Sequence, residues 1–343
     1  MNPSLTDKEL LRTFRELGFV TVSYSLIPIL RDAYKAAVVS DITVLLEGET
    51  GTGKQVLANA IHELDEKRRP HPFVTAHCGT INDSVAETEL FGHSRGAFTG
   101  AVASRKGLFQ SAHLGTIFLD DLSDLPLQLQ SKLLDVIQRG IVRPLGSDEE
   151  KTIDVRIVAA SNQPLGSLVT QHRFRSDLYH RLDVVKLTLP PLRERMEDLP
   201  QLLLFLAYRH RKLYQPIEKI EPDLLQYLQS LAFPGNIRQL ENAVQRMLFA
   251  KTQGISFGLG DWSILRDVDF EEGSDPLNDA AIGLWKAISL RRIPYAQAIW
   301  QVERKLLQTA VRSTVQTHKQ LAEKLQANER TLYHKMRSHH VAA

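Results

Sequence analysis

The residues best suited to chemistry lie in one glycine-rich segment, which reads GETGTGK from Gly48 to Lys54. It stands between a short apolar run and a segment with helical spacing, the context that a phosphate-binding loop of the pattern G-x-x-x-x-G-K requires. Glycines let backbone N–H groups surround a phosphate, the helix N-terminus adds partial positive charge, and Lys54 can pair with the outer phosphates. The predicted nucleotide-binding residues are Gly48, Glu49, Thr50, Gly51, Thr52, Gly53, Lys54 and Gln55.

Two adjacent carboxylates, Asp120 and Asp121, end another apolar run, GTIFLDDL. The first acid after a buried strand beside a phosphate loop is expected to bind Mg²⁺ through water, which assigns this role to Asp120. Asp121 stands where an ATPase of this type normally carries a glutamate to orient the attacking water. Gln55 also departs from the usual pattern, because a serine or threonine after the lysine is a better Mg²⁺ ligand. The two segments together predict that the protein binds ATP with Mg²⁺ and hydrolyses it.

Strands and helices alternate around these residues. Five segments read as buried strands, at residues 40–48, 71–78, 115–122, 153–161 and 183–190. Helical stretches separate them, which predicts an α/β domain with a largely parallel sheet covered on both faces. Beyond residue 190 the strand signal stops, and three helical patterns near residues 196–214, 221–231 and 235–252 predict a small helical lid.

Length and composition are those of an ordinary globular protein. The 343 residues are 43% apolar and 24% charged, and because the formal net charge is +2, any nucleic-acid surface must be local. The single cysteine, Cys78, excludes an intramolecular disulfide and fits a reducing compartment. The chain has neither an apolar run that approaches the length of a bilayer span nor a secretory segment at its start. We therefore expect a cytoplasmic protein with no membrane partner.

Several ordered motifs resemble those of the sigma-54-dependent transcriptional activators, the bacterial enhancer-binding proteins of the AAA+ class. The most specific is ELFGHSRGAFTGA at residues 89–101, which is similar to the loop with which this family contacts sigma-54. FPGNIRQLEN at 233–242 resembles the second sensor, FRSDLYHRL at 174–182 the arginine-finger segment, and LPPLRER at 189–195 a further signature. The resemblance covers residues 23–252 and the last 45 residues.

The resemblance implies a ring, usually a hexamer, with ATP at subunit interfaces and movement of the loop that remodels the sigma-54 RNA polymerase closed complex. Carried over by position, Asn162 would sense the γ-phosphate and Arg238 would contact the nucleotide from the lid. Arg175 and Arg181 would reach into the neighbouring subunit's site, where a guanidinium neutralises charge on the transferred phosphoryl group. The implied sigma-54 contacts are Gly96, Ala97, Phe98, Thr99, Gly100 and Ala101.

Within that loop, the glycines would permit a hinge, Phe98 would supply an apolar anchor and Thr99 a polar contact. Without the neighbouring motifs the segment could equally be a loop tip, or a buried turn whose Phe98 fills the core. The ATPase motifs on either side favour a moving contact.

Two departures from the family's pattern bear on turnover. Asp121 is one methylene shorter than glutamate, and His77 stands where the family normally has an asparagine that couples the catalytic acid to the loop. A histidine can still hydrogen-bond to Asp121 and could act as a pH-sensitive switch, although a merely tolerated substitution explains it equally well. Two functions therefore stay open: an ATP-hydrolysing activator, or an ATP-binding, poorly hydrolysing DNA-binding co-regulator that acts in a mixed oligomer.

The C-terminal segment HKQLAEKLQANERTLYHKMRS, at residues 318–338, reads as two short helices around a turn. From residue 299 to 343 there are eight Lys or Arg against three acids, which suits a helix-turn-helix in the major groove of double-stranded enhancer DNA. It resembles the Fis-type domain that closes many of these activators. The expected DNA contacts are Arg330, Thr331, His334, Lys335 and Arg337.

These observations predict five regions in order. Residues 1–22 are expected to be a short polar lead in place of an N-terminal regulatory domain, and residues 23–190 the α/β ATPase subdomain. Residues 191–252 follow as the lid, 253–298 as a linker, and 299–343 as the helix-turn-helix.

Overall fold

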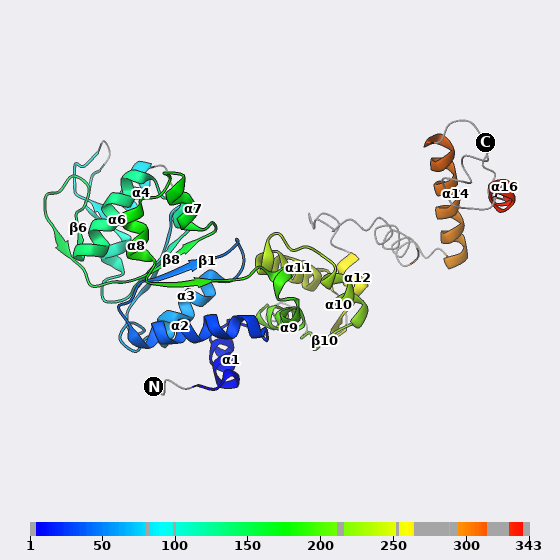
Figure 1. Ribbon diagram of the computed structural model, residues 1–343, viewed down its shortest axis with the longest axis horizontal. Helices are drawn as coiled ribbons and strands as arrows, with labels where there is room; N and C mark the ends of the chain where they lie inside the picture. Colours follow the sequence, from blue (N-terminus) through cyan, green and yellow to red (C-terminus); the bar gives the residue numbers. More distant parts are fainter. Residues whose placement is uncertain are drawn as a thin grey trace. The chain divides into compact units, whose positions relative to one another are not determined.

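The computed structural model describes residues 5–79, 83–98, 101–210, 216–251, 254–263, 288, 294–313 and 329–338 (Figure 1). The chain divides into two compact units, Met1–Phe270 and Glu271–Ala343. In the described parts of the chain, no helix is both long enough and apolar enough to cross a membrane.

A five-stranded parallel sheet in the order β2-β5-β8-β1-β9 is the centre of the first unit. The strands are β2 Phe73–His77, β5 Thr116–Asp120, β8 Arg156–Ser161, β1 Val44–Glu47 and β9 Val185–Thr188. All five predicted strands are present. Since parallel strands point the same way, the phosphate loop after β1 and the acids at the end of β5 lie at one edge of the sheet.

Helices cover both faces of this sheet (Figure 1). One face carries α2 Ile27–Val39 and α3 Lys54–Leu64, and the other carries α4 Asp83–Phe91, α5 Leu108–Ser111, α6 Leu127–Arg139, α7 Leu165–Thr170 and α8 Ser176–Leu182. Strand β8 separates the two apolar cores, because Val158 and Ala160 pack in one and Ile157 and Ala159 in the other. The predicted α/β domain with a parallel sheet is confirmed.

Two short hairpins interrupt the α/β alternation. Strands β3 Gly92–His93 and β4 Arg105–Lys106 pair antiparallel at the base of the loop that contains Phe98. Strands β6 Ile141–Val142 and β7 Lys151–Thr152 form the second hairpin. Motif reading located the first loop but predicted neither hairpin.

The helical lid follows β9. It contains η3 Leu192–Glu194, η4 Met196–Asp198, α9 Leu199–Arg209, α10 Pro222–Gln229 and α11 Asn236–Ala250. It also contains β10 Lys219–Ile220, paired with β11 Ser256–Phe257, and α12 Leu259–Ser263. Phe257 and Trp262 are buried in the lid core. The linker predicted from residue 253 therefore begins too early, because an aromatic pair in a polar stretch gives no periodic signal.

The predicted polar lead is also wrong in part. Helix α1 Asp7–Glu16 begins with a capping box between Thr6 and Glu9 and buries Leu10 and Phe14 in the core. The short turn η1 Tyr24–Leu26 then leads into α2. The polar residues on the outer face of α1 concealed its two-residue apolar stripe.

In the second unit the structure describes α14 Tyr295–Ser313 and α16 Glu329–Ser338. Leu332 and Met336 of α16 are buried, and Lys335 pairs with Glu303 of α14. The first helix of the predicted helix-turn-helix falls outside the described residues, so the motif stays a prediction.

Candidate active site

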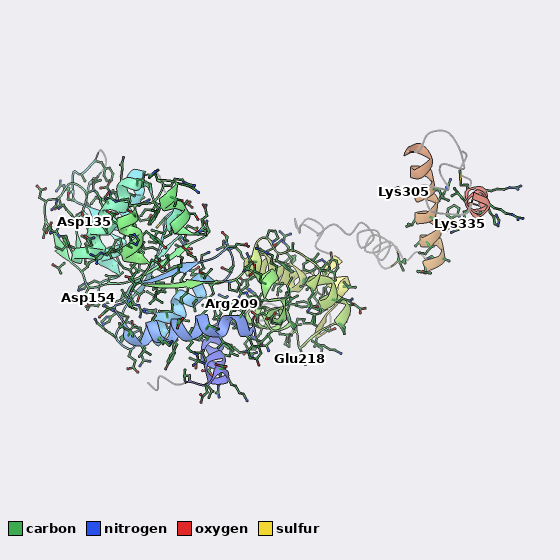
Figure 2. All side chains as sticks on the ribbon, in the orientation of Figure 1. Asp135, Asp154, Arg209, Glu218, Lys305 and Lys335 are labelled. Carbon is green, nitrogen blue, oxygen red and sulfur yellow. The ribbon has the colours of Figure 1, made fainter. Side chains whose placement is uncertain are left out.

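A cavity of about 850 Å³ lies between the sheet edge and the lid. The phosphate loop contributes Gly51 and Lys54 to its wall, β5 contributes Asp120 and Asp121, and the lid contributes Arg238 among others. Arg209 of α9, which also lines the cavity, is labelled in Figure 2. Residues that the sequence had placed in separate motifs, among them Lys54, Asp120 and Arg238, therefore share one pocket.

The phosphate loop is shaped by glycines that no other residue could replace without movement. Gly51 has φ +80°, and a Cβ there would lie 2.3 Å from the carbonyl oxygen of Gly235 in the lid. Gly48 has φ +147°, and its Cβ would lie 2.6 Å from the carbonyl oxygen of Leu189. The loop is thus pressed between β9 and the lid, which needs residues with no side chain.

Lys54 is the buried cation of the site. Its Nζ donates to the carbonyl oxygens of Gly48 at 2.6 Å and Glu49 at 3.0 Å. Burial lowers the pKa of Lys54, while the nearby Asp120 and Asp121 act in the opposite direction. A desolvated ammonium held by two neutral carbonyls would gain from an incoming anion such as a phosphate.

Asp120 lines the same cavity as Lys54. Burial, and then the neighbouring Asp121 carboxylate, raise the pKa of Asp120. Its Oδ1 accepts a hydrogen bond from the backbone N–H of Asp121 at 3.1 Å, and its Oδ2 lies 3.5 Å from His77 Nδ1. Of the two acids, His77 faces Asp120, because His77 ends the neighbouring strand β2 in register with that residue.

Asp121 is paired with Asn162 instead. The Nδ2 of Asn162 lies 3.5 Å from Asp121 Oδ1, and its Oδ1 accepts from Ser123 Oγ at 3.1 Å. Asp121 adopts a left-handed backbone conformation with φ +51°, in which few non-glycine residues occur outside functional sites and turns. Two carboxylates thus share the cavity with Lys54, and Asn162 contacts one of them.

A divalent cation is compatible with this donor set. Among the described residues no group of three or more His, Cys, Asp or Glu side chains could form a complete metal cage. Mg²⁺ needs no such cage, because it keeps several waters and binds through one or two carboxylates plus substrate phosphates. The partly desolvated Asp120, with a raised pKa and no cationic hydrogen-bond donor on its Oδ1, fits that role.

Two lid residues that sequence reasoning did not assign, Arg193 and Asn236, hold the phosphate loop through Glu49. Glu49 accepts two hydrogen bonds from Arg193, at 2.9 and 2.7 Å, and one from Asn236 Nδ2 at 3.1 Å. These hydrogen bonds, from Arg193 first, lower the pKa of Glu49. The buried Asn236 also donates to the carbonyl oxygen of Thr50 at 3.0 Å. We call Glu49, Arg193 and Asn236 the lid clamp.

Arg195 of the lid makes a second contact with the phosphate loop. Arg195 is fully buried, and its Nη2 donates to the carbonyl oxygen of Thr52 at 2.7 Å. Its partner Asp198 accepts from Thr21 Oγ1 and from the backbone of Val22 and Ser23. Both arginines lie in the predicted LPPLRER signature, whose spacing alone did not reveal what it touches.

The two predicted arginine fingers do not belong to this cavity. Arg175, at the start of α8, donates to Asp177 at 2.7 Å and to Ser131 Oγ at 2.9 Å. Arg181 is exposed on the same helix. Both guanidinium groups are therefore on the surface of the chain, separate from the site that its own residues form.

The predicted sigma-54 loop is held at its base. Ser94 Oγ donates to the carbonyl oxygens of Leu145 and Gly146 in the second hairpin, at 3.1 and 2.7 Å. The backbone N–H of Gly96 donates to Ala101 at 2.9 Å, and Ala97 packs against Gly146. Phe98 remains 46% exposed, in edge-to-face contact with His93. Thr99 and Gly100 fall outside the described residues.

The five predicted DNA-contacting residues all lie on α16. Arg330, Thr331, His334, Lys335 and Arg337 are exposed there. Lys335, labelled in Figure 2, pairs with Glu303.

Comparison with known proteins agrees with these features. A family model described as the sigma-54 interaction domain matches residues 21–188, and one described as the AAA+ ATPase lid domain matches residues 193–256. Together the two models span about two thirds of the chain.

The chain belongs to the sigma-54-dependent transcriptional regulators. Within this family, it is 47% identical over 221 residues to the DNA-binding transcriptional activator HyfR of Escherichia coli K12, covering 64% of this chain and 33% of HyfR. It is 45% identical over 208 residues to the transcriptional regulatory protein GlrR of the same strain, covering 60% of this chain and 47% of GlrR. The matched part thus spans a third to a half of these relatives.

Solved structures of NtrX from Brucella abortus are similar over most of the chain. The ADP complex superposes with a TM-score of 0.65 at 26% identity, covering 97% of this chain and 72% of NtrX. The ATP complex gives a TM-score of 0.64 at 26% identity, covering 96% and 72%.

Proposed function

We propose that this protein is an ATP-dependent, DNA-bound transcription activator that remodels the sigma-54 RNA polymerase closed complex to open promoters. One observation carries the proposal: the exposed Phe98 loop stands on a hairpin of the same α/β core that holds Lys54, Asp120 and Asp121 around a cavity of about 850 Å³. A chain with only one of these two features would bind nucleotide or sigma-54 but could not couple them.

ATP binding follows from the chemistry of the cavity. Lys54, now held by two carbonyl oxygens, would turn to the outer phosphates, and the backbone N–H groups of the loop would surround them. Arg238 would contact the phosphates from the lid. The nucleotide complexes of NtrX, which has the same fold, support this assignment.

Hydrolysis would depend on the two acids. Asp120 would hold Mg²⁺ through water, and the bound ion would neutralise charge on the phosphate oxygens. Asp121 would accept a hydrogen bond from the attacking water and orient it in line, with Asn162 fixing the Asp121 carboxylate and responding to the γ-phosphate. Arg175 and Arg181 would act on the site of an adjacent subunit, which makes a homo-oligomer, a hexamer in our proposal, a precondition of turnover.

ATP binding and hydrolysis would move the loop that contains Phe98. Ser94, which follows β3 of the first hairpin, would transmit a shift to the second through its hydrogen bonds to Leu145 and Gly146. Phe98 would enter an apolar site on sigma-54, with Thr99 beside it. Helix α16 would keep the activator on enhancer DNA, through the exposed basic residues that include Arg330 and Arg337.

A second candidate is an ATP-binding co-regulator that hydrolyses poorly and acts in a mixed oligomer. The short Asp121 side chain favours it, as does His77, whose contact with Asp120 leaves Asp121 without the partner expected from the family. The intact loop favours the first candidate, because a protein that never engaged sigma-54 would not need it.

Open-complex formation separates the two candidates. The purified protein would be mixed with sigma-54 RNA polymerase and a promoter on linear DNA, with ATP, with a non-hydrolysable ATP analogue or with no nucleotide. The first candidate predicts opening with ATP alone. No ATP-dependent opening by the isolated protein, restored by adding a related activator, would support the second. Lys54→Ala is the control that should remove opening in every arm.

A further inference from the structure

Helix α1 lies outside the matched family domain, which begins at residue 21, yet it is built into the first unit. Thr6 and Glu9 cap its start reciprocally, which satisfies N–H groups that the helix itself cannot. Leu10 and Phe14 are buried at 1% and 0% exposure. A terminal helix with both a cap and a buried face is a docked element, since these contacts oppose the fraying that is usual at chain ends.

The end of α1 is a precise turn. Gly18 is left-handed at φ +89°, its N–H donates to Arg15 at 3.0 Å, and the N–H of Phe19 donates to Phe14 at 2.9 Å. These are the two hydrogen bonds of a Schellman motif, which brings together the side chains at its two ends. Phe14 and Phe19 accordingly meet edge to face at 6.5 Å.

This turn places Phe19 against the phosphate loop. The Phe19 ring approaches to 3.4 Å from where a Cβ of Gly53 would lie, next to Lys54. Arg15, Glu16, Leu17 and Gly18 line the cavity itself. One wall of the cavity and one support of the loop thus come from residues 7–19, which we call the N-terminal strap.

We propose that the N-terminal strap is part of the nucleotide site: Phe19 positions the phosphate loop from behind, and Arg15 contacts the base or ribose end of the nucleotide. Nucleotide binding and docking of α1 are then thermodynamically linked, so that each stabilises the other. Nucleotide binding then depends on residues that lie outside the matched family domain. The inference rests on the nucleotide site proposed above and extends it.

The linkage can be tested with MgADP on the full chain, measured by isothermal titration calorimetry. We expect Phe19→Ala to weaken MgADP binding about tenfold, because small displacements of a positioned loop are costly. Phe19→Leu keeps an apolar contact with Gly53 and should bind within about threefold of wild type. Arg15→Ala should weaken binding by about three- to tenfold, as loss of a charge-assisted contact does. Lys35→Ala removes an exposed charge from α2, outside the strap and the cavity lining, and is the control, expected to bind like wild type.

Two further readouts distinguish positioning from general destabilisation. Hydrogen exchange should slow at residues 8–19 when MgADP binds to wild type. The rise in thermal midpoint on adding MgADP should shrink in Phe19→Ala relative to Phe19→Leu, whatever the midpoint without nucleotide. Equal MgADP affinities for wild type, Phe19→Ala and Arg15→Ala would overturn the strap while leaving the nucleotide site intact. Failure of wild type itself to bind MgADP would instead overturn the site, and the strap with it.

Discussion

Glycines dominate two loops of the first unit, but they have different surroundings. At Gly51 of the phosphate loop, a Cβ would lie 2.3 Å from the lid backbone, whereas at Gly96 of the predicted sigma-54 loop no atom of the described residues would lie within 4 Å of one. The first loop is contacted by Arg193, Asn236 and Phe19, while the described part of the second is tied only near its base and leaves Phe98 exposed.

This difference shows that glycine content alone says little about mobility. In the phosphate loop glycine permits close approach of backbone to backbone, so the loop is fixed and ready for its ligand. In the predicted sigma-54 loop the described residues leave the space beside Gly96 open, which is compatible with the hinge that we propose there. A phosphate-binding site needs backbone N–H groups in fixed positions, whereas a loop that moves to contact a partner needs a backbone that can change conformation.

The largest expected effect comes from adding one methyl group to each loop. Gly51→Ala would push the phosphate loop from the lid, and we expect ATP turnover to fall by about 10²-fold, the scale of a small misplacement at an active site. Gly96→Ala meets no atom of the described residues, and its strain comes from the left-handed φ of +82°, so ATP turnover should stay within about twofold of wild type. Steady-state phosphate release measures both; equal losses would mean that the two loops are equally constrained.

The exposed tip can be tested without touching the cavity. Phe98→Ala should reduce promoter opening by at least about 30-fold, as expected for an apolar anchor at the centre of an interface. ATP turnover should largely survive. Val102→Ala, a neighbouring exposed side chain outside the glycine-rich core, is the control for both assays. Parallel loss of opening and turnover in Phe98→Ala would point to a structural role for the ring.

The catalytic acid offers a gain of function. In Asp121→Glu the longer side chain brings the carboxylate forward to where the attacking water is expected, and turnover should rise about tenfold. The variant leaves the sigma-54 loop unaltered, so opening should accelerate only where hydrolysis limits it. An unchanged or lower rate of phosphate release would show that the pairing of Asp121 with Asn162 already suits an aspartate.

The lid clamp contains one buried residue, Asn236, and one exposed ion pair, between Arg193 and Glu49, whose effects on ATP binding can be compared. Asn236→Ala leaves the carbonyl oxygen of Thr50 and the N–H of Leu192 without their partner, and we expect the KM for ATP to rise five- to tenfold, consistent with the roughly 1–3 kcal/mol cost of unpaired buried groups. Arg193→Gln breaks an exposed ion pair worth about 0–1 kcal/mol, so its KM should change less than threefold. A reversed order would make the ion pair the main link between lid and loop.

The sequence predicted the elements of the site better than their contacts. Local patterns sufficed for the five strands, for the lid helices and for a phosphate loop placed between β1 and α3, because each is written in neighbouring residues. The lid clamp joins residues 144 and 187 positions apart, and no local pattern encodes such a pairing. The contact of His77 could not be predicted for the same reason: which acid it faces depends on the register between β2 and β5.

The N-terminal strap and the second hairpin show a further limit. Leu10 and Phe14 are too few to give a convincing periodic signal, and the support they provide for Phe19 appears only once the Schellman turn is known. Ser94 likewise has no sequence feature that points to Gly146. The parts that position a loop are less visible in sequence than the loop itself.

The smallest expected effect is one of pH, and it again contrasts the two loops. Burial lowers the pKa of Lys54, so the folded protein releases this proton at lower pH than the unfolded chain does. Where the unfolded chain binds more protons, the free energy of unfolding rises with pH. Without nucleotide, wild type should therefore gain stability relative to Lys54→Met as pH rises towards the ordinary pKa of lysine, about 10.4. Phe98→Leu, in a loop core with no titratable side chain, should run parallel to wild type in denaturant unfolding across the same range. If the difference in free energy of unfolding between wild type and Lys54→Met did not change with pH, Lys54 would have the same pKa in the folded and the unfolded protein. Burial of the ammonium would then not destabilise the folded protein.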